Sequence, residues 1–167
     1  MPAEFDPQGI IDALNGAGVR YVLIGGFAAV IYGSPHVTTD IDIVPDATRD
    51  NLARLSNALR TLHARVWTNA EPDGLPFGHD AESLGRLETW NLVTDHGRLD
   101  ISFRPSGTAG YPDLASEAVR LTILGAEVDV ASLADVIRSK EAAGREKDRA
   151  VLPTLRRLLE EVSRKHT

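Results

Sequence analysis

The chain contains no cysteine, so disulfide bonds, thiolate zinc sites and a cysteine nucleophile are excluded. None of its five histidines forms a His-x-x-x-His pair. A Gly-x-x-x-x-Gly-Lys-Ser/Thr stretch is also absent, which disfavours a P-loop NTPase. No apolar run approaches the roughly 18 residues of a membrane span, and the first residues lack the basic and apolar regions of a secretory signal. We therefore expect a cytoplasmic protein without a membrane segment.

Positive charge is scarce as well, with 18 Lys or Arg against 24 Asp or Glu and a net charge of −6. This balance argues against a broad basic surface that binds nucleic acid by phosphate neutralisation alone. Residues 131–167 nevertheless contain nine Lys or Arg and only six Asp or Glu. An acidic N-terminal part and a mildly basic C-terminal part suit a domain that binds a divalent metal at one place and an anionic substrate at another. Solvated helix faces explain the basic C-terminal part equally well.

The length of 167 residues and the hydrophobic content of 43% suit one domain with a real core. We expect a single domain over residues 1–167, with a core at about 19–130 and a C-terminal helical segment at about 131–167. Hydrophobic spacing and capping residues predict helices at about 7–15, 27–32, 114–119 and 132–143 and helices beginning near 48 and 148. Strand patterns occur at about 19–24, 39–44, 64–67, 89–94, 98–104, 121–124 and 127–130. These elements predict an α+β or α/β fold, a small mixed β-sheet flanked by helices.

Two of the predicted strands carry acidic residues on a polar face. Residues two apart in a strand point the same way, so Asp40 and Asp42 share a face with Thr38 while Ile41 points into the core. The same alternation places Asp100 on the polar face of strand 98–104. Asp40 and Asp42 lie roughly 6.5–7 Å apart along the strand, which suits two metal ions about 3.5–4 Å apart. The three carboxylates are therefore predicted to converge and to bind Mg²⁺ or Mn²⁺, which prefer such hard oxygen ligands.

A Gly-Gly pair and a Gly-Ser pair flank the short helix predicted at 27–32. Gly25-Gly26 follows a strand and exposes backbone N–H groups where that helix begins, so a phosphate can approach closely. Gly33-Ser34 ends the helix and offers another N–H and a hydroxyl. A triphosphate held there would present its metal-bridged oxygens to the first two carboxylates. The third carboxylate would then be free to bind a second metal ion and to activate an attacking hydroxyl.

The order Gly-Gly, short helix, Gly-Ser, Asp-x-Asp and a later strand Asp resembles the nucleotidyltransferase superfamily, whose members have a polymerase beta-like fold and transfer a nucleoside monophosphate from an NTP to a hydroxyl. The resemblance is closest to a small bacterial branch that includes the AbiEii-like and MenT-like toxins of toxin–antitoxin pairs. In that branch the motif typically reads Gly-Gly, then Gly, then Arg-x-Thr-x-Asp-Ile-Asp. The matching residues here are Gly25, Gly26, Gly33, Thr38, Asp40, Ile41 and Asp42. His36 stands where Arg is usual, and a neutral His cannot replace a guanidinium fork.

The later segment 139–148 is similar to the Lys, then Gly-Arg-x-x-Asp element of the same superfamily. The resemblance implies that Lys140 meets the nucleotide phosphates and neutralises charge in catalysis, and that Arg145 belongs to the nucleotide site. Asp148 would orient Lys140 or start the last helix. Ordinary charges on a helix and at its end are an equally open interpretation of Lys140 and Arg145.

Three functional hypotheses follow from these residues. In the leading one, the protein is a metal-dependent nucleotidyltransferase toxin that uses an NTP such as ATP, modifies tRNA 3′ ends and has a cognate antitoxin as partner. In the second, it is a non-catalytic module that binds a nucleotide or a partner. In the third, it modifies a small molecule, as antibiotic-modifying enzymes do, or a protein. The Gly- and Pro-rich stretch at 68–88 is predicted to be a long loop that covers the site and, with the C-terminal helices, selects the acceptor. The lack of a second helical domain makes an aminoglycoside acceptor less expected.

Overall fold

A seven-stranded mixed sheet lies at the centre of the computed structural model, which describes residues 4–165. Its strands are β1 (Tyr21–Ile24), β2 (Asp40–Pro45), β3 (Arg65–Val66), β4 (Thr89–Thr94), β5 (Gly97–Ser102), β6 (Val119–Ile123) and β7 (Ala126–Val130). They are arranged in the order β3-β4-β5-β2-β1-β7-β6. β2 runs parallel to β5 and β1 runs parallel to β7, whereas the other neighbours are antiparallel. The predicted mixed sheet is therefore confirmed.

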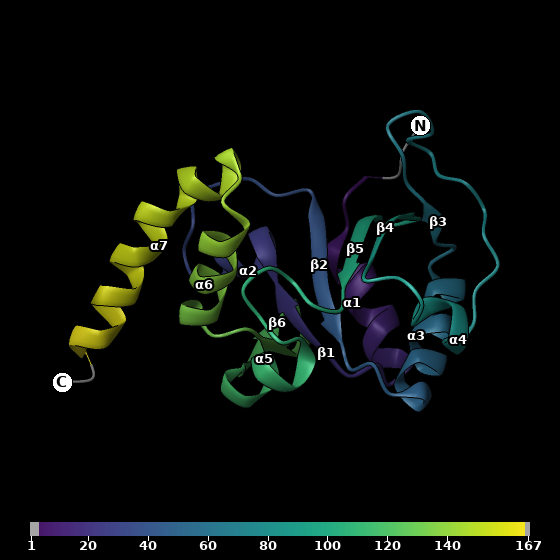
Figure 1. Cartoon of the computed structure of the whole chain (residues 1–167), viewed down its shortest axis with the longest axis horizontal. Coiled ribbons are helices and arrows are strands. Elements are labelled where there is room, and N and C mark those ends of the chain that lie inside the picture. Colours follow the sequence, from purple (N-terminus) through teal and green to yellow (C-terminus); the bar gives the residue numbers. More distant parts are fainter. Residues whose placement is uncertain (1–3, 166–167) are drawn as a thin grey trace.

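Helices lie at both ends of this sheet (Figure 1). They are α1 (Pro7–Gly16), α2 (Gly25–Ile31), α3 (Arg49–Thr61), α4 (Ala81–Leu84), α5 (Tyr111–Glu117), α6 (Leu133–Ala143) and α7 (Glu146–Lys165). α1 packs on β2, β5 and α3, while α2 packs on β1, β2 and α6. In Figure 1, α6 and α7 stand at one end of the molecule, and α3 and α4 stand at the other. The two strands that carry the acidic residues run between these groups of helices.

The core follows from the alternation of side chains along β2 and β5. Ile41, Ile43 and Leu99 are completely buried on the face toward α1, which contributes Ile10 and Leu14 to the same core. Each such side chain stabilises the fold by roughly 1.5–3 kcal/mol. Because the apolar residues fix which face is buried, the intervening acidic residues must point to the opposite face.

Predicted capping signals act as expected at two helices. Asp6 accepts a hydrogen bond from the Gly9 backbone N–H at 3.2 Å and so caps α1. Ser132 accepts from the Asp135 backbone N–H at 3.1 Å and caps α6. α6 ends at Gly144, whose φ of +61° is the left-handed conformation that glycine adopts without strain.

The stretch 68–88 is not loop throughout, because it contains α4. The Asp80 carboxylate accepts from the Ser83 backbone N–H at 2.8 Å, and the Ser83 hydroxyl accepts from the Asp80 backbone N–H. These two bonds form a capping box. Leu84 is completely buried, and its carbonyl accepts from Trp90 Nε1 at 3.0 Å. A helix of four residues is too short to show a helical period, so the pattern missed it.

The helix predicted at 114–119 is displaced toward the N-terminus. α5 starts at Tyr111, directly after Gly110 with its φ of +90°, and Pro112 lies in its first turn, where the missing N–H has no cost. Val119 belongs to β6 instead and pairs with Val130. The prediction was wrong here because Gly110 and Pro112, which begin this helix, are residue types more typical of loops.

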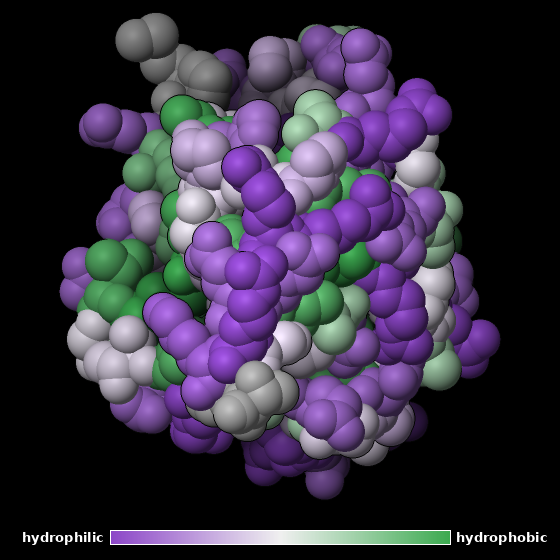
Figure 2. Space-filling model, turned by 90° about the vertical axis from the view of Figure 1, so that its left-hand side faces the viewer, coloured by the Kyte–Doolittle hydropathy of each residue, from purple (hydrophilic) through white to green (hydrophobic). Residues whose placement is uncertain are grey.

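α7 presents different faces to the protein and to solvent. Val151, Leu152 and Leu155 are buried against the domain. The face of the molecule that carries this helix shows a band of hydrophilic residues with hydrophobic areas on either side of it (Figure 2). Among residues 4–165, no helix combines the length and apolar character needed to cross a membrane.

Candidate active site

Asp40, Asp42 and Asp100 converge on the polar face of the sheet. β2 and β5 are adjacent parallel strands, and Asp42 lies directly opposite Asp100 in their register. One carboxylate oxygen of each of the three residues lies within 4.8 Å of the others. The convergence predicted from strand alternation is thus what the structure shows.

The electrostatics of this cluster explain why it would hold a cation. Burial raises the pKa of Asp42 to about 6, and the charge of Asp40 adds to the shift while Lys147 and Lys140 oppose it. Burial likewise raises the pKa of Asp100 to about 7, with further contributions from a hydrogen bond with Asp40 and the charge of Asp42. Three carboxylates at this spacing resist full ionisation unless a positive ion joins them. Their hard oxygen atoms fit Mg²⁺ or Mn²⁺.

Gly25 makes room for one of these acids. A Cβ atom at this position would lie 2.2 Å from Asp42 Oδ2, and the φ of Gly25 is +78°. Any other residue would therefore displace the carboxylate as well as strain the backbone. A Cβ atom on Gly26 would lie a more tolerable 3.2 Å from Thr38 Oγ1. That hydroxyl donates to Asp40 Oδ1 at 3.2 Å, so Thr38 helps to orient Asp40.

A cavity of about 700 Å³ opens over the acidic cluster, within the ~300–1,000 Å³ typical of small-molecule sites. All but one of the site residues predicted from the sequence line it. These are Gly25, Gly26, Ser34, Thr38, Asp40, Asp42, Asp100, Lys140, Arg145 and Asp148. Gly33 is the exception: it follows α2, and a Cβ atom at this position would lie 3.5 Å from Leu158 of α7. His36, which stands at the usual Arg position, also lines the cavity.

An ion cluster centred on the buried Asp148 holds Lys140 and Arg145 on the α6 and α7 side of this cavity. Asp148 is completely buried and accepts from Arg145 Nε at 2.7 Å, and its Oδ1 lies 3.6 Å from Lys140 Nζ. Burial alone would raise the pKa of Asp148, but hydrogen bonds from Arg145 and the charges of Arg145 and Lys140 outweigh it and lower the pKa. Asp148 is therefore an ionised anchor that keeps Lys140 directed at the cavity.

Several residues at the site were missed by the sequence reasoning. Thr89, Asn91 and Ser102 line the cavity on its β4 and β5 side. Arg98 Nη2 donates to Asp100 Oδ1 at 2.9 Å, and its guanidinium stacks 3.9 Å above the Trp67 ring. Signals for some of them exist in the sequence. Strand alternation places Arg98 on the face of Asp100, and the hairpin turn at 95–97 sets a register that pairs Asn91 with Asp100.

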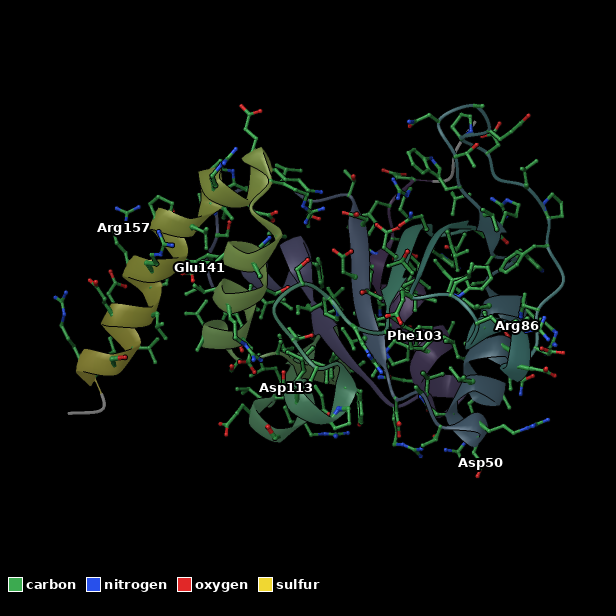
Figure 3. The ribbon with its side chains drawn as sticks, viewed as in Figure 1. Asp50, Arg86, Phe103, Asp113, Glu141 and Arg157 are labelled. Atoms are coloured by element: carbon green, nitrogen blue, oxygen red, sulfur yellow. The ribbon has the colours of Figure 1, made fainter. Side chains whose placement is uncertain are left out.

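The predicted acceptor loop is not part of the cavity. No residue of 68–88 lines it. Arg86, just after α4, lies at the opposite end of the molecule from Glu141 of α6 and Arg157 of α7 (Figure 3). The expectation that this loop covers the site was therefore wrong, because Phe77 stacks on Trp90 at a centroid distance of 5.5 Å and anchors the loop elsewhere.

Comparisons with known proteins identify relatives of this fold. The model of the aminoglycoside-2''-adenylyltransferase family matches residues 8–154. No curated protein sequence matches the chain significantly. Among solved structures, the lincosamide antibiotic adenylyltransferase LnuA with bound lincomycin is 14% identical with a TM-score of 0.60, covering 93% of this chain and 99% of that one. A Thermotoga maritima protein designated a nucleotidyltransferase is 19% identical with a TM-score of 0.55, covering 95% and 97%.

The two structural neighbours share the fold over nearly their whole lengths, and the family match extends over most of the present sequence. The resemblance to the nucleotidyltransferase superfamily is thereby confirmed. The chain belongs to the aminoglycoside-2''-adenylyltransferase family and is an NTP-dependent nucleotidyltransferase.

Proposed function

We propose that this enzyme transfers a nucleoside monophosphate from an NTP to a hydroxyl group of a small molecule, with Mg²⁺ or Mn²⁺ held by Asp40, Asp42 and Asp100. The observation that carries the proposal is the convergence of these carboxylates, within 4.8 Å of one another, beneath a cavity with cations on one side. That arrangement matches what transfer from a polyphosphate requires, namely metal ligands beside a site for negative charge.

The nucleotide would bind on the α2, α6 and α7 side of the cavity. Lys140 and Arg145, both held by Asp148, would neutralise its phosphates. Gly26 would offer its backbone N–H and Ser34 its hydroxyl, because both residues line the cavity. Gly33 could contribute only indirectly, by ending α2 and so placing Ser34.

In the reaction, the acceptor hydroxyl oxygen forms a bond to the α-phosphorus of the NTP. The bond between that phosphorus and the oxygen bridging to the β-phosphate breaks, and pyrophosphate leaves with the electron pair. Asp100 is placed to accept the hydroxyl proton, since it lines the cavity and Arg98 Nη2 holds its Oδ1 in position. The divalent ions, when bound, stabilise the charge that develops on the phosphate oxygens.

A small-molecule acceptor is favoured over tRNA. The matching family is named for an aminoglycoside adenylyltransferase, and one structural neighbour was solved with lincomycin bound. The net charge of −6 offers no general attraction for RNA. The tRNA-modifying toxin, its antitoxin partner and its cytoplasmic location have no support from these comparisons and stay alternatives for experiment to decide.

The test is to incubate the protein with each α-labelled NTP, Mg²⁺ or Mn²⁺, and three acceptor samples: a pool of hydroxylated small molecules, total tRNA, and the protein alone. Wild type should label a small molecule. Asp42→Asn should lose at least about 10²–10³-fold in rate, because it removes a metal ligand. Asp12→Asn is the matched control, since Asp12 is an exposed acid of α1 outside the cavity, and it should retain full activity.

The destination of the label decides between the hypotheses. Label on tRNA would restore the toxin interpretation, and label on the polypeptide would indicate a protein-modifying enzyme. If folded wild-type protein labels nothing with any NTP, the proposed function is wrong and a binding module becomes the better explanation.

A further inference from the structure

The cavity has a second side whose chemistry differs from that of the nucleotide side. It is formed by neutral polar residues of β4, β5 and the turn that follows β5, and we call it the acceptor surface. Its residues are Thr89, Asn91, Ser102 and Ser106. Building on the proposed function, we propose that this surface selects an uncharged, hydroxyl-rich acceptor such as a neutral sugar, and discriminates against polycations.

Strand register places the acceptor surface directly beside the reacting group. Asp42 is opposite Asp100 across β2 and β5, and Asp100 is opposite Asn91 across β5 and β4. Neighbouring strands lie roughly 4.8 Å apart, so the Asn91 side chain is one strand beyond Asp100 on the same face. Thr89 and Ser102 form the next such pair along the hairpin. An acceptor whose hydroxyl reaches Asp100 must therefore lie over these residues.

The side chains of the acceptor surface are free to bind a ligand. Throughout the described range 4–165, none of the four has a hydrogen-bond partner for its side chain, and Thr89 and Asn91 are exposed. Hydroxyl and amide groups both donate and accept, which is what the hydroxyl groups of a sugar need. The surface thus offers hydrogen bonds in both directions without offering charge.

No carboxylate is left over for the amino groups of a polycation. Four acids line the cavity, and three of them, Asp40, Asp42 and Asp100, are the proposed metal ligands. The fourth, Asp148, is paired with Arg145 and Lys140. Arg98 adds a positive charge beside Asp100 at the edge of the acceptor surface. An acceptor with several ammonium groups would lose water there without gaining ion pairs, which is how a site discriminates against the wrong charge.

The loop at 68–88 does not supply the missing acids. Its Phe77 stacks on Trp90, whose side chain lies on the opposite face of β4 from Asn91. Glu88, just before β4, is exposed and does not line the cavity. Discrimination against polycationic acceptors must therefore come from the residues of β4 and β5.

The test compares two acceptors that share one scaffold, kanamycin and kanamycin with every amino group acetylated. With Mg²⁺ and the NTP that the wild type uses, we expect kcat/KM to be at least about tenfold higher for the acetylated, neutral form, the loss expected from unpaired desolvated charge. Asn91→Ala should raise KM for the acceptor by about 3–10-fold and leave KM for the NTP unchanged. Asn91→Asp should shift the preference toward the amine form.

Asn57→Asp provides the matched control, because it adds the same charge on the exposed surface of α3 away from the cavity. It should leave the preference between the two acceptors unchanged. A wild-type preference for kanamycin itself overturns the inference, as does labelling of neither form when another acceptor is labelled. In both cases the proposed nucleotidyl transfer still stands. Absence of label on every acceptor rejects transfer and this inference together.

Discussion

The two sides of the cavity differ in how strongly the fold constrains them. On the nucleotide side, Lys140 and Arg145 are tied to Asp148, which is completely buried beneath them. On the acceptor surface, Asn91 and Thr89 are exposed side chains on a strand whose opposite face carries the packing. A substitution on the nucleotide side alters both the stability of the fold and the charge of the cavity. A substitution on the acceptor surface alters only which acceptor can bind.

This difference corresponds to what each substrate demands. A triphosphate always presents the same negative charge, so the residues that bind it can be fixed by an internal ion cluster. An acceptor needs only a hydroxyl near Asp100, and the rest of the molecule is recognised by surface side chains. We therefore expect activity to be most sensitive near β2 and α2, less sensitive at α6, and insensitive at the loop around Phe77.

After loss of a metal ligand itself, the largest effect is expected at Gly25. Gly25→Ala would place its Cβ 2.2 Å from Asp42 Oδ2 and force the metal ligand away, so kcat should fall by about 10²-fold. Gly26→Ala is the control, because its Cβ would meet only the Thr38 hydroxyl at 3.2 Å, and it should cost much less. Steady-state kinetics with Mg²⁺ measure both. Equal losses for the two variants would show that the glycines act on the phosphates and not on Asp42.

A smaller effect is expected at Lys140. Lys140→Ala removes the proposed charged contact to the nucleotide, worth about 1.5–3 kcal/mol, and should raise KM for the NTP by about 10–100-fold. KM for the acceptor should not change. Lys165→Ala, at the exposed end of α7, removes the same charge outside the cavity and should have no effect. A matching rise in KM for the acceptor would contradict the division of the cavity into a nucleotide side and a separate acceptor surface.

The metal site should reveal itself as a pH-dependent shift in melting temperature. The folded pKa values of about 6 for Asp42 and about 7 for Asp100 exceed the unfolded value of about 3.9. The folded state therefore binds more protons than the unfolded state, and these two groups lower the stability of the metal-free protein as pH rises from about 4 to about 7.

Mg²⁺ or Mn²⁺ needs the ionised ligands, so it should raise the melting temperature little at about pH 5 and by several degrees at about pH 8. Calorimetry with and without the ion measures the shift. Asp42→Asn should abolish the shift and should itself melt higher than wild type in the metal-free state at about pH 8. A metal-induced shift that is independent of pH would place the ion elsewhere.

The smallest effect on activity is expected at Phe77. Phe77→Ala removes the stacking on Trp90 and should destabilise the protein by about 1–2 kcal/mol. Denaturant unfolding measures that loss. Because the loop lies outside the cavity, kcat and both KM values should stay at the wild-type level. A changed acceptor preference would restore this loop to the role predicted from its composition.

Much of the site was predictable because local patterns encode it. Alternation of apolar and acidic residues in 39–44 and 98–104 places the acids on one face whatever the rest of the fold does. Ser132 and Gly144 mark the ends of α6 by the backbone groups they satisfy, and those signals need no tertiary contact. The assignment of Lys140, Arg145 and Asp148 came from a motif, and the structure gathers these three residues into one ion cluster.

The sequence by itself thus determined the strands and helices, the polar face of each acidic strand and the glycine-flanked helix, since each depends on residues a few positions apart. The pairing of β2 with β5, which brings Asp100 to Asp42, is tertiary. Only the tertiary structure decided that Gly25 makes room for Asp42, that Arg98 holds Asp100, and that the acceptor surface lies on β4. It also moved the loop at 68–88 away from the cavity, through the stacking of Phe77 on Trp90. These facts depend on strand register and on packing between distant segments, which local chain chemistry does not fix.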